Sequence, residues 1–268
     1  EFSYQPANDL VNPYILSLHY DPITIGGLLK QAGIALWGEE RPLILVWLAS
    51  TSDDRGTELI GAESRQNKMA HALLRQSQIF GLPLLFPTLD LADTSQVTVD
   101  DVTQAAIPVL KDASKRYPAA KVLLIGKVHP TGDGYYSDWH LVTDDQDWHW
   151  TATDKTEGDI ATGILRQSME TLARYYGISA SNAAPTWIKL QVDNITARAQ
   201  LAQLTDYIKQ LPSVQQVQLA QVSGDSVELA LQVRGSLEVF QQHTAMSDYL
   251  QLKSQDPVNK LLVYQWVH

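Results

Sequence analysis

Hydrophobic and polar residues alternate along the chain in short blocks, and the spacing within each block predicts the element that it forms. The segment 43–49 is apolar at every position, which is typical of a strand that is covered on both faces. A strand at 14–20 is predicted before it, followed by a helix that begins at Asp21-Pro22. A polar helix that ends at Gly81 is predicted after it, with a short strand at 84–86. This order predicts alternating strands and helices, with 43–49 as the central strand.

The middle of the chain departs from this alternation. Three successive strands are predicted there, at 121–129, 135–142 and 148–153. Ahead of them, Thr98 and Asp101 have the spacing of a helix capping box, and Pro108 should divide that helix into two pieces. Behind them, Thr156 and Asp159 repeat the capping spacing at the start of a helix with one apolar face. The pattern therefore predicts an antiparallel meander between flanking helices.

A second unit follows the last of these helices. Residues 179–185 read SASNAAP, a small and polar composition that is typical of a linker between domains. Beyond them come a strand, a helix that ends before Pro212, a hairpin around Gly224-Asp225 and a second helix. A final apolar segment, 261–267, can add an edge strand to either sheet.

We therefore predict an α+β protein of two domains, which also suits a length of 268 residues. The first domain, 1–178, is expected to contain a mixed sheet with an antiparallel meander and flanking helices. The second domain, 186–268, is expected to be a βαββα sandwich that an additional C-terminal strand can extend.

Composition narrows the classes of partner and of chemistry. The formal net charge of −10 repels a phosphate backbone, so nucleic acid is not expected as a partner. The chain has no cysteine, which excludes disulfides, thiolate nucleophiles and cysteine metal sites. No stretch approaches the roughly 20 apolar residues that a membrane-spanning helix needs, so no transmembrane segment is expected.

A cluster of histidines and aspartates in the predicted meander is the best candidate for chemistry. Its members are Asp138, His140, Asp147 and His149. A turn at Asp144-Asp145 would place His140 opposite His149, and two imidazoles with two carboxylates can bind zinc or a similar ion. The same register places the apolar side chains on the other face, namely Trp139, Leu141, Trp148 and Trp150. A half-buried sheet with its polar face toward water explains this pattern without any ion.

Motifs of the common enzyme classes are absent. The loop Thr131-Gly132-Asp133-Gly134 lacks the Lys-Ser/Thr pair of a phosphate-binding loop, so we expect a hairpin tip there. The chain has neither a serine nucleophile elbow nor the paired histidines of a zinc-protease helix. The pairs Asp53-Asp54 and Asp100-Asp101 occupy turn and helix-start positions, where local backbone bonding accounts for them. No catalytic residue and no cofactor is therefore predicted.

Candidate contact residues lie in the second domain. Trp187 alternates away from the apolar positions of its strand, and an exposed tryptophan on a sheet is typical of an interface. Gln216 and Gln218 belong to a polar but uncharged strand, which suits a sheet edge or a contact with another subunit. Packing of Trp187 within the protein, and a merely solvated glutamine strand, are the alternatives.

One segment resembles a known family. Residues 20–49 read YDPITIGGLLKQAGIALWGEERPLILVWLA, with the motif LLKQAG-x3-WG-x2-RP-x3-VWLA. This resembles the bacterial envelope protein family catalogued as domain of unknown function twenty sixty-six, and the likeness continues through 122–128, Trp139 and Trp148. The resemblance implies a periplasmic protein whose export signal precedes Glu1. It implies no activity and no catalytic residue.

The leading hypothesis is a periplasmic, non-enzymatic protein that binds or assembles with an envelope protein, with self-association as a further expectation. The alternative is a metal-dependent or small-ligand-binding enzyme or sensor. It would use the face with His140 and His149, or the cleft between the two domains.

Overall fold

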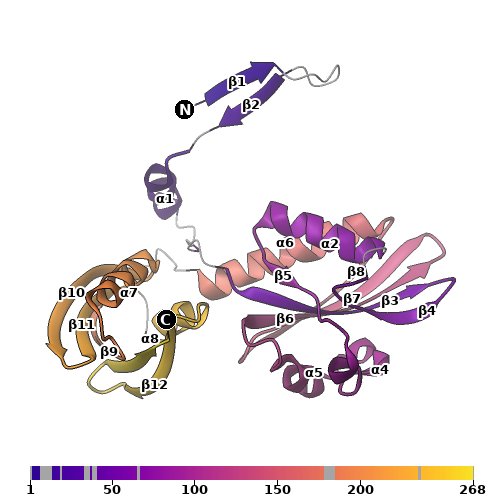
Figure 1. The fold of residues 1–268 in the computed structure, drawn as a ribbon. Helices are drawn as coiled ribbons and strands as arrows, with labels where there is room; N and C mark the ends of the chain where they lie inside the picture. The colour runs from indigo at the N-terminus through magenta and orange to yellow at the C-terminus, as the bar shows by residue number, and fades with distance from the viewer. Residues whose placement is uncertain are drawn as a thin grey trace.

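A computed structural model describes residues 2–6, 14–18, 20–32, 37, 41–64, 67–177, 185–234 and 237–267. These residues form sheets of two, six and five strands with helices packed against the larger two (Figure 1). The fold is α+β, as the sequence predicts. No helix in this described part of the chain is long and apolar enough to cross a membrane.

The first elements form a small unit of their own. Strands β1 (Phe2–Pro6) and β2 (Tyr14–Leu18) pair antiparallel, and helix α1 (Pro22–Gln31) follows them. Strand β2 matches the segment predicted at 14–20, but it pairs with β1 and not with the six-stranded sheet. In Figure 1 this hairpin stands apart from both larger sheets.

The six-stranded sheet has the order β4-β3-β6-β7-β8, with β5 also paired to β3. Its strands are β3 (Leu43–Ser52), β4 (Gly56–Ile60), β5 (Leu84–Leu85), β6 (Ala120–Thr131), β7 (Gly134–Val142) and β8 (Asp147–Asp154). Strands β3 and β6 run parallel, and β6, β7 and β8 form the antiparallel meander that the sequence predicts. Two strands of the first 178 residues were not predicted, namely β4, which is short and partly polar, and β1, which is short and lies outside this sheet.

Helices cover both faces of this sheet (Figure 1). Helices α2 (Lys68–Phe80) and α6 (Glu157–Tyr176) pack on one face. On the other lie α3 (Leu91–Thr94), α4 (Val99–Thr103) and α5 (Ile107–Ser114). Alternate residues of β3 enter the two cores, so Val46 packs below α2 and α6 while Trp47 packs toward α4 and α5. The central, doubly buried strand predicted at 43–49 is confirmed.

Local signals set the helix boundaries. Thr98 and Asp101 form the predicted capping box, and Thr156 accepts from the backbone of Asp159 at the start of α6. Pro108 lies in the first turn of α5, where its missing N–H costs no helical hydrogen bond. The helix is therefore divided into α4 and α5, as predicted.

The five-stranded sheet has the order β10-β11-β9-β13-β12. Its elements are β9 (Thr186–Asp193), α7 (Arg198–Gln210), β10 (Val214–Ser223), β11 (Ser226–Val233), α8 (Leu237–Ala245), β12 (Leu250–Asp256) and β13 (Leu261–Trp266). The βαββα order is present, with two further strands. The predicted C-terminal strand is present as β13, but its predicted edge position was wrong, because β13 pairs with β9 on one side and with β12 on the other. Of the predicted linker, only Pro185 lies within the described residues.

Specific polar contacts join the two larger sheets and their helices. His243 of α8 is fully buried, with Nε2 2.7 Å from the carbonyl oxygen of Tyr176 and Nδ1 3.1 Å from Ser213 Oγ. Lys121 of β6 pairs with Asp248 at 3.2 Å. The division into domains at 179–185 stays a prediction.

Two residues of the segment that resembles the envelope family have a packing role, namely Trp37 and Arg41. The guanidinium carbon of Arg41 lies 4.1 Å from the centre of the Trp37 ring. Trp37 in turn stacks on Tyr176 at the end of α6, with ring centres 6.0 Å apart. These residues hold the start of β3 against α6.

Candidate functional site

The five-stranded sheet has two unlike faces. Helices α7 and α8 pack on the face that carries Ile188, Leu190 and Val192, and the sheet curves around them (Figure 1). The opposite side, which we call the outer face, carries Trp187, Lys189, Gln191, Gln216, Gln218 and Gln232. Trp187 is 43% exposed there, so its predicted orientation away from the core is what the structure shows.

Strand register brings the predicted contact residues together. Gln216 of β10 pairs with Gln232 of β11, which pairs with Trp187 of β9. Adjacent strands lie about 4.8 Å apart, so the backbones of Gln216 and Trp187 lie about 10 Å apart in one row. Gln218 lies in the next row, opposite Ala230. The three residues therefore share one surface.

Strand β10 is an edge strand with unusual composition for that position. Its ten residues, VQQVQLAQVS, include no charge and no proline, the usual means of blocking an edge. Leu219 and Val222 are each 54% exposed, although they pair with core residues of β11. Register shifts next to Gln215 and Ala220 twist the strand, while the run from Gln216 to Leu219 stays regular. Among the described residues, its outer edge has no strand partner.

The His/Asp cluster lies on the meander, on the face toward α4 and α5. His140 pairs directly with His149, as predicted, and their ring centres are 4.5 Å apart. His140 Nδ1 lies 3.0 Å from Asp147 Oδ1, and His149 Nε2 lies 2.6 Å from Asp138 Oδ1. The predicted apolar residues Trp139 and Leu141 are buried in the core on the opposite face. All four predicted residues are therefore brought together.

A lysine that the sequence analysis did not single out completes this cluster. Lys127 of β6 lies 3.1 Å from Asp138 Oδ2 and donates to the carbonyl of Thr103 at the end of α4. Burial raises the pKa of Asp138, but hydrogen bonds from His149 and Lys127 outweigh it and hold the pKa below its usual range. Asp138 is therefore a carboxylate at neutral pH. Lys127 was missed although it pairs with Asp138 across the predicted β6–β7 hairpin, so the alternation that paired the histidines could also have indicated it.

A second feature missed by the sequence analysis is a polar cavity where the parallel strands β3 and β6 end. It has a volume of about 560 Å³ and is bounded by the residues after β3 and the starts of α2 and α6. Burial raises the pKa of Glu157 there, against the opposing charge of Lys68. Lys68 and Glu157 also border a neighbouring cavity of about 700 Å³, with Arg75 and Lys155. The place of this cavity could have been expected from the predicted strands, because ligands of open α/β sheets commonly lie at the carboxyl ends of strands.

The remaining candidate motifs have structural roles. Thr131 and Gly134 pair at the tip of the β6–β7 hairpin, as predicted. Asp101 closes the capping box of α4. Asp53 and Asp54 lie in the turn between β3 and β4 and border the first cavity.

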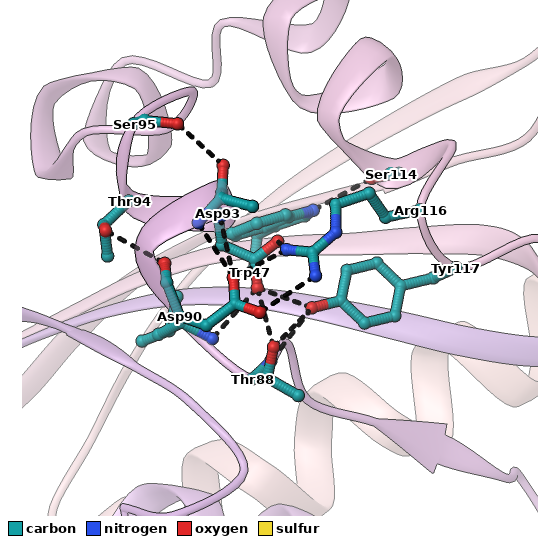
Figure 2. Close-up of polar contacts among 11 residues, drawn as sticks. Trp47, Thr88, Asp90, Asp93, Thr94, Ser95, Ser114, Arg116 and Tyr117 are labelled. Atoms are coloured by element: carbon teal, nitrogen blue, oxygen red, sulfur yellow. Dashed lines mark hydrogen bonds and ion pairs between the residues drawn. The ribbon is translucent and has the colours of Figure 1, made fainter.

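The most connected polar network surrounds Asp93 of α3 (Figure 2). This carboxylate is buried and accepts from Arg116 Nη1 at 2.6 Å, Tyr117 OH at 2.6 Å and Thr88 Oγ1 at 3.1 Å. Arg116 also binds both oxygens of Asp90, which caps α3. Because both oxygens of Asp93 are satisfied within the protein, the network holds the loop before α3 on the end of α5.

Comparisons with known proteins give no family. No protein-family model matches the chain, and none of the curated proteins matches it. Protein VC0702 from Vibrio cholerae aligns over 50% of this chain and 73% of its own at 12% identity, with a TM-score of 0.25. TolB from Acinetobacter baumannii aligns over 59% and 33% at 15% identity, also with a TM-score of 0.25. S. aureus homoserine dehydrogenase aligns over 68% and 51% at 10% identity, with a TM-score of 0.19.

Likenesses of this strength carry no functional argument. The aligned regions span only a third of the TolB chain and about half of the dehydrogenase chain. The function is therefore argued from the surfaces of the protein itself.

Proposed function

We propose that this chain binds another protein, without catalysing a reaction, by pairing an extended segment of that protein with β10. The observation that carries the proposal is the uncharged, ten-residue edge strand, in which Leu219 and Val222 are exposed. Added strands gain main-chain hydrogen bonds from the edge and specificity from the side chains on each face.

The two sides of β10 suit this kind of contact. On the helix side, Leu219 and Val222 offer apolar area that a partner side chain can cover. On the outer face, the row of Gln216, Gln232 and Trp187 offers hydrogen bonds and one large aromatic ring. Interface cores are depleted in charge and enriched in tryptophan, because burying an unpaired charge is costly.

The proposed partner is a protein of the cell envelope, and the proposed compartment is the periplasm. The resemblance of residues 20–49 to an envelope family supports both. Fractionation of cells that make the natural protein should release it with the periplasmic contents. Recovery with the cytoplasmic contents would remove this part of the proposal.

Photo-crosslinking in those cells tests the binding surface. A photoreactive phenylalanine analogue replaces Leu219 in one variant and Ile79 in a control, since Ile79 is 69% exposed on α2 at the far sheet. We expect a discrete crosslinked product at position 219 and none at 79. A product with the mass of two chains would identify a second copy as the partner. Equal amounts of crosslinked product at positions 219 and 79 would contradict the proposal.

The Trp187→Ala substitution tests the outer face independently. Truncating a central tryptophan commonly costs 2 kcal/mol or more of binding free energy, which is roughly 30-fold in affinity. We expect the product at position 219 to fall accordingly. An unchanged amount of this product would show that the partner contacts only the helix side of β10.

A further inference from the structure

Three side chains on the polar face of the meander can converge on one ion. Asp138, His140 and His149 each offer a ligand atom, and these atoms lie within 4.8 Å of one another. Tetrahedral zinc holds ligand atoms about 3.3 Å apart, so the more distant pairs have to close by at most about 1.5 Å, while His149 Nε2 and Asp138 Oδ1, now 2.6 Å apart, have to separate slightly. The side chain of His149 is 50% exposed, which leaves it room to rotate.

Asp147 prepares His140 to act as a ligand. A carboxylate only accepts hydrogen bonds, so the 3.0 Å contact between His140 Nδ1 and Asp147 Oδ1 places the ring proton on Nδ1. The lone pair of His140 is then on Nε2. A carboxylate behind a ligating histidine is the common second partner in zinc sites, where it fixes the tautomer and the ring orientation.

The imidazole of His149 and the carboxylate of Asp138 already contact each other. His149 Nε2 lies 2.6 Å from Asp138 Oδ1. The other carboxylate oxygen of Asp138 is held by Lys127, which is itself fixed by the carbonyl of Thr103. Oδ1 is therefore the oxygen that faces the two imidazoles.

We propose that Asp138, His140 and His149 form a zinc-binding site in which the ion takes the place of the hydrogen bond between His149 and Asp138. The proton on Nε2 of neutral His149 moves by way of solvent to Nδ1, so that Nε2 binds the ion and both imidazoles remain neutral. The carboxylates of Asp138 and Asp147 place two negative charges near the ion, and Asp138 shares its charge with Lys127. Asp147 is a positioning residue, which acts through His140.

The surroundings leave space for a further ligand. A cavity of about 100 Å³ adjoins Asp138 and His140 and is closed by Lys127 and the residues that end α4. Its lining is polar, and a volume of this size holds several water molecules. Three protein ligands with an open position filled by water are the arrangement of an accessible zinc site, as distinct from a closed structural one.

Calorimetric titration of ZnCl₂ into the chelator-treated full chain tests the site. We expect one zinc ion per chain, with affinity that decreases from pH 7.5 to pH 5.5 because protons compete for the imidazoles. His140→Ala and His149→Ala should each weaken binding more than about 100-fold, since even residues behind the ligands contribute 10- to 100-fold. The matched control is His129→Ala, which lies on the same face of the meander, one row from Asp138 and two rows from His140 and His149.

Three results would overturn the proposal. One is the absence of zinc binding to wild-type protein that circular dichroism shows to be folded. Another is unchanged binding in the His140→Ala, His149→Ala double variant. A loss of binding equal to theirs in His129→Ala would place the ion elsewhere and would also reject the site.

The role of Asp147 has its own measurement. Asp147→Asn should weaken zinc binding about tenfold, and nitrogen NMR shifts of the His140 ring should show the proton redistributed from Nδ1 to Nε2. An unchanged tautomer in the variant would reject the positioning role. Because the site lies on the six-stranded sheet, these results are independent of strand pairing at β10.

Discussion

The carboxylate of Asp93 shows how a charge is kept inside this protein. The side chain has no exposed surface, while Arg116, which neutralises it, is 37% exposed and remains in contact with water. Hydrogen bonds from Thr88 and Tyr117 occupy the remaining acceptor positions. Burial of a charge is tolerated when it is paired and its lone pairs are satisfied, so each partner is needed.

Removing the arginine should therefore be costly. Arg116→Met leaves Asp93 buried without its cation, and we expect the free energy of unfolding to fall by about 3 kcal/mol. The adjacent Lys115→Met, which breaks a fully solvated pair with Asp112, should change it by at most about 0.5 kcal/mol. Urea denaturation of both variants measures the difference. Similar losses would contradict a structural role for the network.

His243 predicts a pH dependence of stability. Burial lowers its pKa, and the hydrogen bond to the carbonyl of Tyr176 opposes this only in part. The unfolded chain therefore takes up a proton at higher pH than the folded one, and stability is lost as the pH falls below about 6.5. His243→Gln should show a smaller loss between pH 7.5 and pH 5.5 in urea denaturation. The exposed His71→Gln should keep the wild-type dependence.

Residue-scale prediction worked where partners lie on neighbouring strands joined by a short turn. The facing of His140 and His149 followed from alternation and one turn. The environment of Asp93 could not be predicted in this way, because Arg116 and Tyr117 are more than 20 residues away from it in the chain. Only the packing of α5 on the sheet brings them within hydrogen-bonding distance.

At the scale of elements, the backbone of β6 lies very close to one side chain of β7. Gly126 of β6 lies against the indole of Trp139, and a Cβ at this position would overlap the ring. Trp139 is fully buried between the sheet and its helices. The absence of a side chain at 126 therefore makes the space that the tryptophan fills.

A pair of glycine substitutions tests this packing. Gly126→Ala should lower the free energy of unfolding by about 2 kcal/mol, because the core has to shift around Trp139. Gly163→Ala in α6 faces open space and should raise it by about 0.7 kcal/mol through helix propensity. Thermal and urea denaturation both report the sign. A neutral Gly126→Ala would show that the ring can move aside without cost.

Elements were predictable where hydrophobic spacing and a boundary signal agreed. The capping box at Thr98 and the break at Pro108 gave α4 and α5. Strand β12 has the sequence LQLKSQD, which has little apolar alternation, and it was not predicted. Pairing with β13 makes it a strand, and that pairing is a tertiary interaction.

At the scale of the whole molecule, the apolar residues gather in separate cores. Two lie on the faces of the six-stranded sheet, and one lies between the five-stranded sheet and its helices. The contact between α6 and α8 joins the core of the six-stranded sheet to that of the five-stranded sheet, and His243 is buried at this contact.

This separation predicts how a core mutation spreads. Leu229→Ala in β11 should cost about 3 kcal/mol of stability in its own core. Amide hydrogen exchange should accelerate in β9 to β13 and stay near wild type in β3 and β6, because local opening follows cooperative units. Equal acceleration in both sheets would show one cooperative unit and would contradict the prediction of two domains.

The sequence by itself determined the α+β class, the central strand at 43–49, the meander and the outward direction of Trp187. Each follows from side-chain period and local turn chemistry, which act over a few residues. The tertiary structure alone decided that β13 lies inside its sheet and that β10 is left at the edge. These features depend on which strands pair across long separations, and side-chain alternation is the same for every such pairing.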